Sequence, residues 1–271
     1  MSSQTRRSIA PTALDRRALV KEVSLVALCA MAYSILCNIA PITAQSANAH
    51  ARQILRIEDL LGLDIELSAN LWLQRHPVIA ESFAIYYSVS FFALTFGALL
   101  LIWFQKPEHY HFSRNVLFIM TGAAMVTYWV YPLAPPRLLS GTAFVDSVAQ
   151  QSAFGSGYSQ LYSALGNPYA AMPSMHTGWS IWVAVCLGLF VWKAPWQRLL
   201  LAIHPALTII IVITTGNHYI LDAVAGALYF LGAFLFVRAV FSNICHSHVV
   251  TDAERQATAT KSPTSAVTSL V

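Results

Sequence analysis

Charged residues are scarce in this chain. Asp, Glu, Lys and Arg make up 10% of its 271 residues, whereas soluble globular domains usually carry roughly 25%. That scarcity excludes an ordinary soluble enzyme. Three of the four cysteines lie inside apolar runs and the fourth just beyond one, so neither a disulfide framework nor a zinc site is expected. The basic residues are scattered and the formal net charge is +4, so no nucleic-acid partner is expected.

Long apolar runs take the place of charge, and hydrophobic residues make up 56% of the chain. A helix of about 20 apolar residues crosses the hydrocarbon core because it satisfies its own backbone groups. Six stretches qualify, and the third, fourth and fifth are short. The sequence therefore predicts an all-α polytopic membrane domain over residues 23–241, with six transmembrane helices at about 23–42, 82–104, 115–132, 176–193, 198–215 and 219–240.

The distribution of basic residues predicts the orientation. If the N-terminus is cytoplasmic, twelve of the 16 Lys and Arg residues lie in inner segments, as the positive-inside rule requires. Residues 1–22 then form a basic cytoplasmic segment, and residues 242–271 form a disordered cytoplasmic tail. The first apolar run lacks a good signal-peptide cleavage site, so it is interpreted as a transmembrane helix that stays in the mature protein. We expect an integral protein of the plasma membrane, bacterial in origin.

Two long connections lie on the outer side in this topology. Residues 51–73 interleave Ile and Leu with acidic and basic residues, which predicts an amphipathic helix at the membrane interface between the first and second spans. Residues 138–172 are rich in Gly, Ser, Ala and Tyr and show no strong period. They predict a loop long enough to bind substrate.

Three polar clusters stand where spans meet the outer interface. They are residues 131–137 (YPLAPPR), 167–177 (NPYAAMPSMHT) and 215–222 (TGNHYILD). Topology alone places their ionisable side chains at one membrane level, and such residues are by default candidates for a functional site. The candidates are Arg137, Ser174, His176, His218 and Asp222.

The second cluster suits an anion. Pro173 is expected to open a helix in its first turn, so that backbone N–H groups near Met175 and His176 face outward with the positive end of the helix dipole. Arg137 can donate two hydrogen bonds to phosphate oxygens, and Ser174 adds a neutral donor. Taken alone, Arg137 could equally reach to lipid headgroups.

His218 and Asp222 are four residues apart, so on a helix they share a face and Asp222 can fix the tautomer of His218. An oriented imidazole can act as nucleophile or base, and His176 can protonate a leaving oxygen. A pair that only stabilises the helix junction is the alternative. Asn167 and Tyr169 are weaker candidates for substrate contacts.

These residues carry a resemblance. PSMH at 173–176 followed by HYILD at 218–222 resembles the second and third signatures of the type 2 phosphatidic acid phosphatase superfamily. The longer strings YPLAPPR, NPYAAMPSMH and GNHYILD resemble the branch that contains the inositol phosphorylceramide synthases. The resemblance spans roughly residues 50–240, and three motifs in order at the expected membrane ends are specific.

The resemblance implies a role for each residue. His218 would form a phosphohistidine, Asp222 would orient it, and His176 would be the general acid, with no metal or cofactor. Arg137 and Ser174 would hold the phosphoryl oxygens. Two cations common in the superfamily are missing, since Val130 and Val212 stand in place of a lysine and an arginine.

The sequence therefore predicts a metal-independent phosphotransferase or phosphatase that acts on a lipid-linked phosphate or phosphodiester at the extracytoplasmic face. The missing cations favour transfer of a phosphoinositol-like headgroup to an alcohol or lipid acceptor. A phosphatase of phosphatidic acid or a polyprenyl phosphate is the alternative. A carrier of anionic lipids without chemistry is the alternative from another class.

Overall fold

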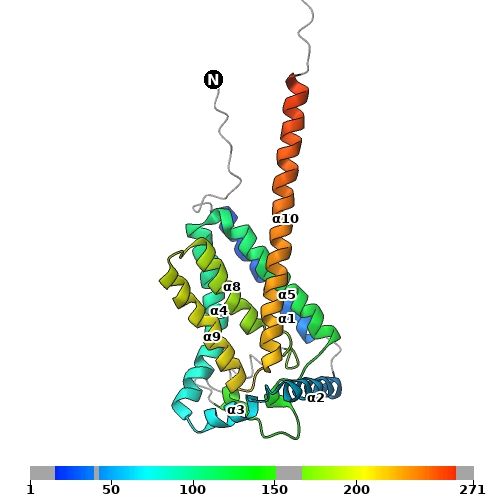
Figure 1. The fold of residues 1–271 in the computed structure, drawn as a ribbon, viewed down its shortest axis with the longest axis vertical. Coiled ribbons are helices and arrows are strands. Elements are labelled where there is room, and N and C mark those ends of the chain that lie inside the picture. The colour runs from blue at the N-terminus through cyan, green and yellow to red at the C-terminus, as the bar shows by residue number, and fades with distance from the viewer. Residues whose placement is uncertain (1–15, 40–42, 151–166, 261–271) are drawn as a thin grey trace, which may run out of the picture.

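The computed structural model describes residues 16–39, 43–150 and 167–260, and this part of the chain is helical without any strand. The longer helices form a bundle, and short elements close one of its ends (Figure 1). This confirms the all-α prediction. The elements are α1 (Arg16–Asn38), α2 (Ala44–Leu61), α3 (Glu66–Gln74), α4 (Pro77–Gln105), α5 (Pro107–Val130), η1 (Pro136–Leu138), α6 (Ser147–Gln150), α8 (Met175–Phe190), α9 (Pro195–Thr214) and α10 (Ile220–Thr260).

Helix α8 forms the centre of the bundle, where it packs against α4, α5, α9 and α10. The main core lies between these helices and includes Trp103, Met120 and Trp182, all of which are almost fully buried. The indole Nε1 of Trp182 donates to the carbonyl oxygen of Ser113 at 2.9 Å, so the polar atom of this large side chain is satisfied. A rigid centre of this kind fixes the position of the end of α8 that carries His176.

Four helices in the described residues are long and apolar enough to cross a membrane. They contain the candidate spans Arg16–Leu36, Pro77–Gln105, Pro195–Thr214 and Ile220–Phe241. Helix α8 is apolar but shorter, and α5 begins with the polar residues of Pro107–Asn115. Helices stand at all six predicted ranges, while their number as membrane spans stays a prediction.

The predicted interfacial helix over residues 51–73 is two helices in the structure. Helix α2 begins earlier, after the N-cap Thr43, and ends at Gly62, whose φ of 69° is left-handed. The Gly62 N–H donates to the carbonyl oxygen of Asp59 and the Leu63 N–H to that of Glu58. A glycine that adopts this conformation without strain ends a helix, so a single helix through Gly62 was the wrong prediction.

Helix α10 also differs from expectation, because it continues to Thr260 and projects beyond the bundle in Figure 1. The backbone of residues 242–260 is therefore helical, where the sequence predicted a disordered tail. No proline follows Ile220 until Pro263, and Ala, Glu, Arg and Gln near the end favour a helix. Residues 261–271, like the basic residues 1–15, lie outside the described part.

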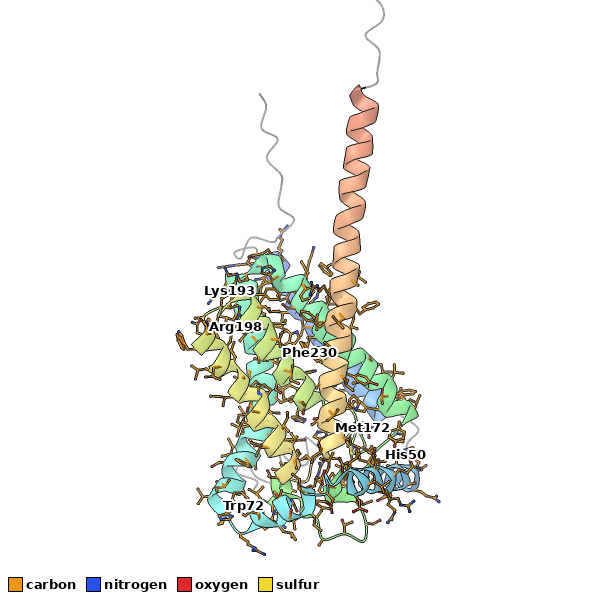
Figure 2. All side chains as sticks on the ribbon, in the orientation of Figure 1. His50, Trp72, Met172, Lys193, Arg198 and Phe230 are labelled. Carbon is orange, nitrogen blue, oxygen red and sulfur yellow. The ribbon has the colours of Figure 1, made fainter. Side chains whose placement is uncertain are left out.

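The two ends of the bundle differ in what they carry. Lys193 and Arg198 lie at the end from which α10 projects, whereas His50, Trp72 and Met172 lie at the opposite end (Figure 2). Helices α2 and α3 run across this second end. The three polar clusters meet there.

Candidate active site

Main-chain hydrogen bonds join the first cluster to the second. The Leu133 N–H donates to the Tyr169 carbonyl at 2.8 Å, and the Ala171 N–H donates back to Leu133 at 3.3 Å. Leu133 and Ala170 thereby form an isolated parallel β-bridge. The side-chain oxygen of Asn167 accepts from the Tyr169 N–H at 2.9 Å and stabilises the turn before the bridge. This pairing fixes the carbonyl group of Ala171.

The second cluster meets the third at a close crossing of α8 and α10. The Ser174 N–H donates to the Asp222 carbonyl at 2.9 Å. A Cβ atom added at Gly226 would lie 2.2 Å from the Ser174 oxygen, and one at Gly178 would lie 3.2 Å from the Gly226 oxygen. Since only glycine permits such an approach, Gly226 sets the distance between the helix ends that carry His176 and His218.

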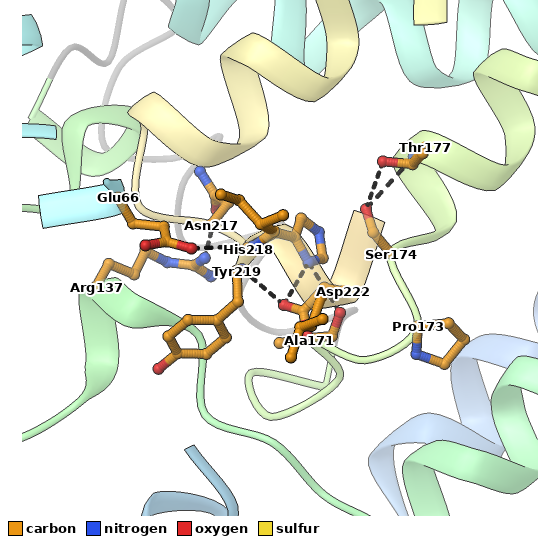
Figure 3. A network of polar contacts seen from close by, with 12 residues as sticks. Glu66, Arg137, Ala171, Pro173, Ser174, Thr177, Asn217, His218, Tyr219 and Asp222 are labelled. Atoms are coloured by element: carbon orange, nitrogen blue, oxygen red, sulfur yellow. Dashed lines mark hydrogen bonds and ion pairs between the residues drawn. The ribbon is translucent and has the colours of Figure 1, made fainter. Parts of the chain in front are cut away.

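His218 is fixed by its Nδ1 atom (Figure 3). Nδ1 lies 2.8 Å from the carbonyl oxygen of Ala171 and 3.3 Å from Oδ2 of Asp222. A carbonyl can only accept, so Nδ1 carries the hydrogen and Nε2 keeps its lone pair. The side chain is buried, with 5% of its residue surface exposed. This tautomer presents Nε2 as a nucleophile.

The sequence placed His218 and Asp222 on one helix face, and this part of the prediction was wrong. Helix α10 begins at Ile220, so His218 lies in the turn before it. Asp222 sits in the first helical turn, and its Oδ2 accepts from the Tyr219 N–H at 2.9 Å. Side chains at this position commonly reach back to the residue that starts the helix. The contact with His218 is real, but the closer partner is the Ala171 carbonyl.

Two further carboxylates support the same turn. Glu66 from α3 accepts a hydrogen bond from the Ile220 N–H at 3.2 Å, and Glu58 from α2 accepts one from the Leu221 N–H at 2.8 Å. The N–H groups of a helix start have no partner within the helix. With Asp222 on Tyr219, side-chain carboxylates satisfy three consecutive donors at the start of α10.

His176 is held by aromatic rings. Its ring stacks on that of Tyr87 with centroids 4.3 Å apart, and it lies 4.2 Å from the ring of Phe91. The ring centroids of His176 and His218 are 5.7 Å apart. No described residue forms a hydrogen bond with the His176 ring. The two imidazoles thus lie next to each other and are held by different means.

The helix expected to open at Pro173 begins two residues later. Helix α8 starts at Met175, and Ser174 is its N-cap. The Ser174 Oγ accepts from the Thr177 N–H at 3.4 Å and from the Thr177 hydroxyl at 3.3 Å. Pro173 therefore precedes the helix because the serine cap, not the proline, starts it. The N–H groups of Met175 and His176 stand at the positive end of the α8 dipole.

Arg137 is anchored beside the His218 turn. Its backbone N–H donates to the Gly216 carbonyl at 2.9 Å, and its Nη1 donates to the side-chain oxygen of Asn217. Its Nε lies 3.1 Å from Oδ2 of Asp146. Within the described chain Nη2 has no hydrogen-bond partner, so one edge of the guanidinium is available to an anion.

The structure thus gathers most of the predicted residues at one end of the bundle. His176, Ser174 and Met175 come from the start of α8, His218 and Asp222 from the start of α10, and Arg137 from η1. Asn167 and Tyr169 lie at the edge of this site and serve the backbone pairing described above. The residues before them, 151–166, lie outside the described part of the chain, including most of the predicted outer loop.

Five contributors to the site were not predicted from the sequence. Ala171 and Asn217 lie inside the second and third polar clusters, and this closeness in sequence to His176 and His218 was the one signal that could have pointed to them. Asp146 sits in the loop after η1, with no pattern to mark it. Glu58 and Glu66 are among the charged residues of the predicted interfacial helix, yet they are 0% and 1% exposed. The pattern of neighbouring residues in the sequence does not indicate that these two side chains are buried.

The geometry allows covalent phosphoryl chemistry. It offers a nucleophilic nitrogen, a second imidazole beside it, a guanidinium edge and the start of a helix, which together form the arrangement expected for attack on phosphorus. Across the described residues, no group of three His, Cys, Asp or Glu side chains is placed to hold a metal ion.

Comparison with known proteins gives the family. The PAP2 superfamily matches residues 52–236, well over half of the chain. The chain therefore belongs to the PAP2 superfamily. No curated protein and no solved structure matches it. Membership, together with the apolar helices, indicates an integral membrane protein and a phosphatase or phosphotransferase that acts on lipid phosphates.

Proposed function

We propose that the protein transfers a phosphoryl or substituted phosphoryl group from a lipid through a phosphohistidine on His218, without a metal. The observation that carries this proposal is the hydrogen bond between Nδ1 of His218 and the carbonyl oxygen of Ala171. It leaves Nε2 free for attack, and the His176 ring lies 5.7 Å away. A general acid at this distance can reach the leaving oxygen of a phosphate held between the rings.

The reaction runs in two displacements. Nε2 of His218 forms a bond to phosphorus while the bond to the leaving oxygen breaks, and His176 gives its proton to that oxygen. An acceptor hydroxyl then loses its proton to His176, its oxygen bonds to phosphorus, and the N–P bond breaks. Water as acceptor gives hydrolysis, and an alcohol gives transfer.

The phosphoryl oxygens are held from two sides. The Nη2 edge of Arg137 binds one side, and the N–H groups of Met175 and His176 bind the other with the α8 dipole. Ser174 can add its hydroxyl hydrogen, since its oxygen already accepts from Thr177. The start of α10 is unsuited to an anion, because carboxylates occupy its donors.

In the proposed topology six helices cross the membrane over residues 23–241, namely α1, α4, α5, α8, α9 and α10. Both termini are cytoplasmic and the site faces outward, near the lipid headgroups. Helices α2 and α3 lie at the interface, and exposed Ile57, Leu60, Leu61 and Ile65 fit this position. Residues 242–260 continue α10 beyond the membrane.

A singly charged phosphodiester suits this site better than a dianionic monoester. Of the two expected cations that are missing, Val130 is 74% exposed at the end of α5, and Val212 is 1% exposed beneath the His218 turn. Arg137 itself is partly neutralised by Asp146. One shared positive charge favours a substrate with one negative charge. We therefore propose a phosphodiester headgroup, such as phosphoinositol, as the transferred group.

The superfamily supports a second candidate, which is hydrolysis of phosphatidic acid or a polyprenyl phosphate. The two candidates differ in the charge they need at Arg137. We expect Asp146→Asn to raise kcat/KM for phosphatidic acid several-fold relative to phosphatidylinositol, because it removes a negative charge near the phosphate. An unchanged ratio would contradict the role of Asp146.

The test is turnover by the purified protein in detergent with EDTA. Phosphatidylinositol, phosphatidic acid and a polyprenyl phosphate are compared, with and without an acceptor alcohol. We expect turnover that survives chelation and falls roughly 10⁴-fold or more in His218→Ala. If folded wild-type protein transports these lipids but turns over none, the proposal fails in favour of a carrier.

A further inference from the structure

Two buried acids at the site have no part in the reaction just described. Glu58 and Glu66 are 0% and 1% exposed, although they come from α2 and α3 at the outer end of the bundle. A buried carboxylate is costly unless its oxygens are satisfied. Their hydrogen bonds run to Leu221 and Ile220, consecutive N–H donors in the first turn of α10. Both acids therefore act on the element that follows His218.

This arrangement fixes the turn from two directions. Glu66 reaches it from α3 and Glu58 from α2, while Asp222 closes it from within α10 through the Tyr219 N–H. The carboxylates also complement the positive end of the helix dipole. A shift of either glutamate would move Ile220 or Leu221, and with them the preceding His218.

Three carboxyl groups in one buried place cannot all be ionised at low cost. One oxygen of Glu58, Oε2, is buried and has no hydrogen-bond partner among the described residues. Burial raises the pKa of Glu58 to about 8, as does repulsion by Glu66 and Asp222, while the Leu221 N–H opposes the rise. A proton on Oε2 gives this orphaned atom a role as a donor.

We propose that Glu58 is held in its protonated form and, together with Glu66, positions the first turn of α10 so that His218 points at the substrate. The proposal rests on the proposed function in one respect only, namely which reaction His218 carries out. Neither acid touches the reacting atoms. They are positioning residues that act through Ile220 and Leu221.

The groups around the pair determine its response to pH. Glu66 faces Glu58 from α3, and Asp222 and Tyr219 face it from the start of α10. A tyrosine phenol ordinarily carries no charge near pH 8. Tyr131 and Arg137 come from the segment packed against α2, and Arg137 is already paired with Asp146. Near pH 8 Glu58 is therefore the group that loses a proton.

The proton on Glu58 determines how stability and activity depend on pH. Glu58 titrates near 4.5 when unfolded and near 8 in the fold, so the folded protein binds more protons in this window and loses stability as the pH rises through it. Above pH 8 a second buried charge repels Glu66 and Asp222 and loosens the turn. We therefore expect kcat to fall on the alkaline side while KM changes little.

The experiment compares Glu58→Gln, Glu58→Ala and Asp59→Asn in the full-length protein. Glutamine keeps the oxygen that accepts from Leu221 and supplies a permanent donor to Glu66, so it mimics the protonated acid. Alanine removes both functions. Asp59 is the exposed neighbour on the same helix, and its replacement is the matched control. The readouts are kcat and KM from pH 6 to 9.5 and the midpoint of thermal unfolding over the same range.

We expect Glu58→Gln to keep near wild-type kcat at pH 7 and to lose the alkaline fall. Glu58→Ala should lose kcat about 10²-fold, as misplaced catalytic groups do, and Asp59→Asn should match wild type. Between pH 6 and 9 the unfolding midpoint of wild type should drop roughly 4 °C further than that of Glu58→Gln.

The proposal is overturned if Glu58→Gln follows wild type in both pH curves, or if folded Glu58→Ala keeps its kcat. The unfolding curves need no substrate. If wild-type protein turns over no lipid, the proposed function fails, and the difference in unfolding midpoint between wild type and Glu58→Gln still decides whether Glu58 is protonated in the fold.

Discussion

The two histidines of the site are held in opposite ways. His218 is fixed by polar contacts, since its Nδ1 meets a backbone carbonyl and a carboxylate. His176 is held by the faces of Tyr87 and Phe91. Hydrogen bonds determine which nitrogen of His218 carries a hydrogen. Ring contacts hold His176 without a hydrogen bond from any described residue to either of its nitrogens.

This difference matches two chemical tasks. A nucleophile needs one fixed tautomer and one direction of attack, while a general acid and base must change its protonation twice in each cycle. The support of His218 therefore extends through Asp222 to Glu58 and Glu66, whereas His176 depends on the packing of α4 against α8. Substitutions that disturb the support of His218 should therefore change the kinetics in a different way from substitutions that disturb the support of His176.

The largest effect that separates the histidines is expected from His176→Gln. Loss of a general acid costs about 10²–10⁴-fold in rate, but the cost depends on the leaving group. We expect a large loss with a lipid alkoxide and a much smaller loss with an aryl phosphoester, whose phenolate leaves without a proton. Steady-state kinetics with both substrates measures this, and equal losses would contradict the assignment.

Gly226→Ala should separate the histidines without touching either. Its new Cβ would meet the Ser174 oxygen at 2.2 Å, so α8 and α10 must move apart. We expect about 10²-fold lower kcat and a loss of stability of about 1–3 kcal/mol. Gly232→Ala on the same helix is the control, because nothing lies within 4 Å of its Cβ. Equal activities of the two variants would show that the crossing does not set the geometry.

A smaller loss is expected from Asp222→Asn. The Ala171 carbonyl is the nearer partner of Nδ1 and keeps the tautomer of His218 when the carboxylate becomes an amide. The amide oxygen can still accept from the Tyr219 N–H. Loss of one charge-assisted contact is worth about 2 kcal/mol, or roughly 30-fold in kcat. If Asp222→Asn were as inactive as His218→Ala, the backbone carbonyl would not suffice to hold the tautomer.

The sequence was most informative where a signal is local. Long apolar runs located helices α1, α4, α5, α8, α9 and α10, because a helix that can cross a membrane is visible in the sequence as a run of apolar residues. Ordered polar motifs located His176, His218 and Arg137, because topology brings the ends of successive spans to one side. Both signals lie within a few residues along the chain.

What the sequence did not show depends on contacts between distant segments. Nothing local marks the Ala171 carbonyl as the partner of His218, since the backbone pairing with Leu133 creates it. Glu58 looked like a solvated residue of an amphipathic helix, and its burial needs α10 above it. The break at Gly62 was in principle readable, because glycine after a helical run is a common end signal.

The most direct test of the account is to trap the phosphorylated enzyme. Protein mixed with a lipid labelled at phosphorus is quenched in base, which preserves phosphohistidine, and its peptides are analysed by mass spectrometry. We predict label on the peptide containing His218 in wild type and none in His218→Ala. Turnover without label on that peptide, or label on His176 instead, would contradict the assignment of His218 as the nucleophile.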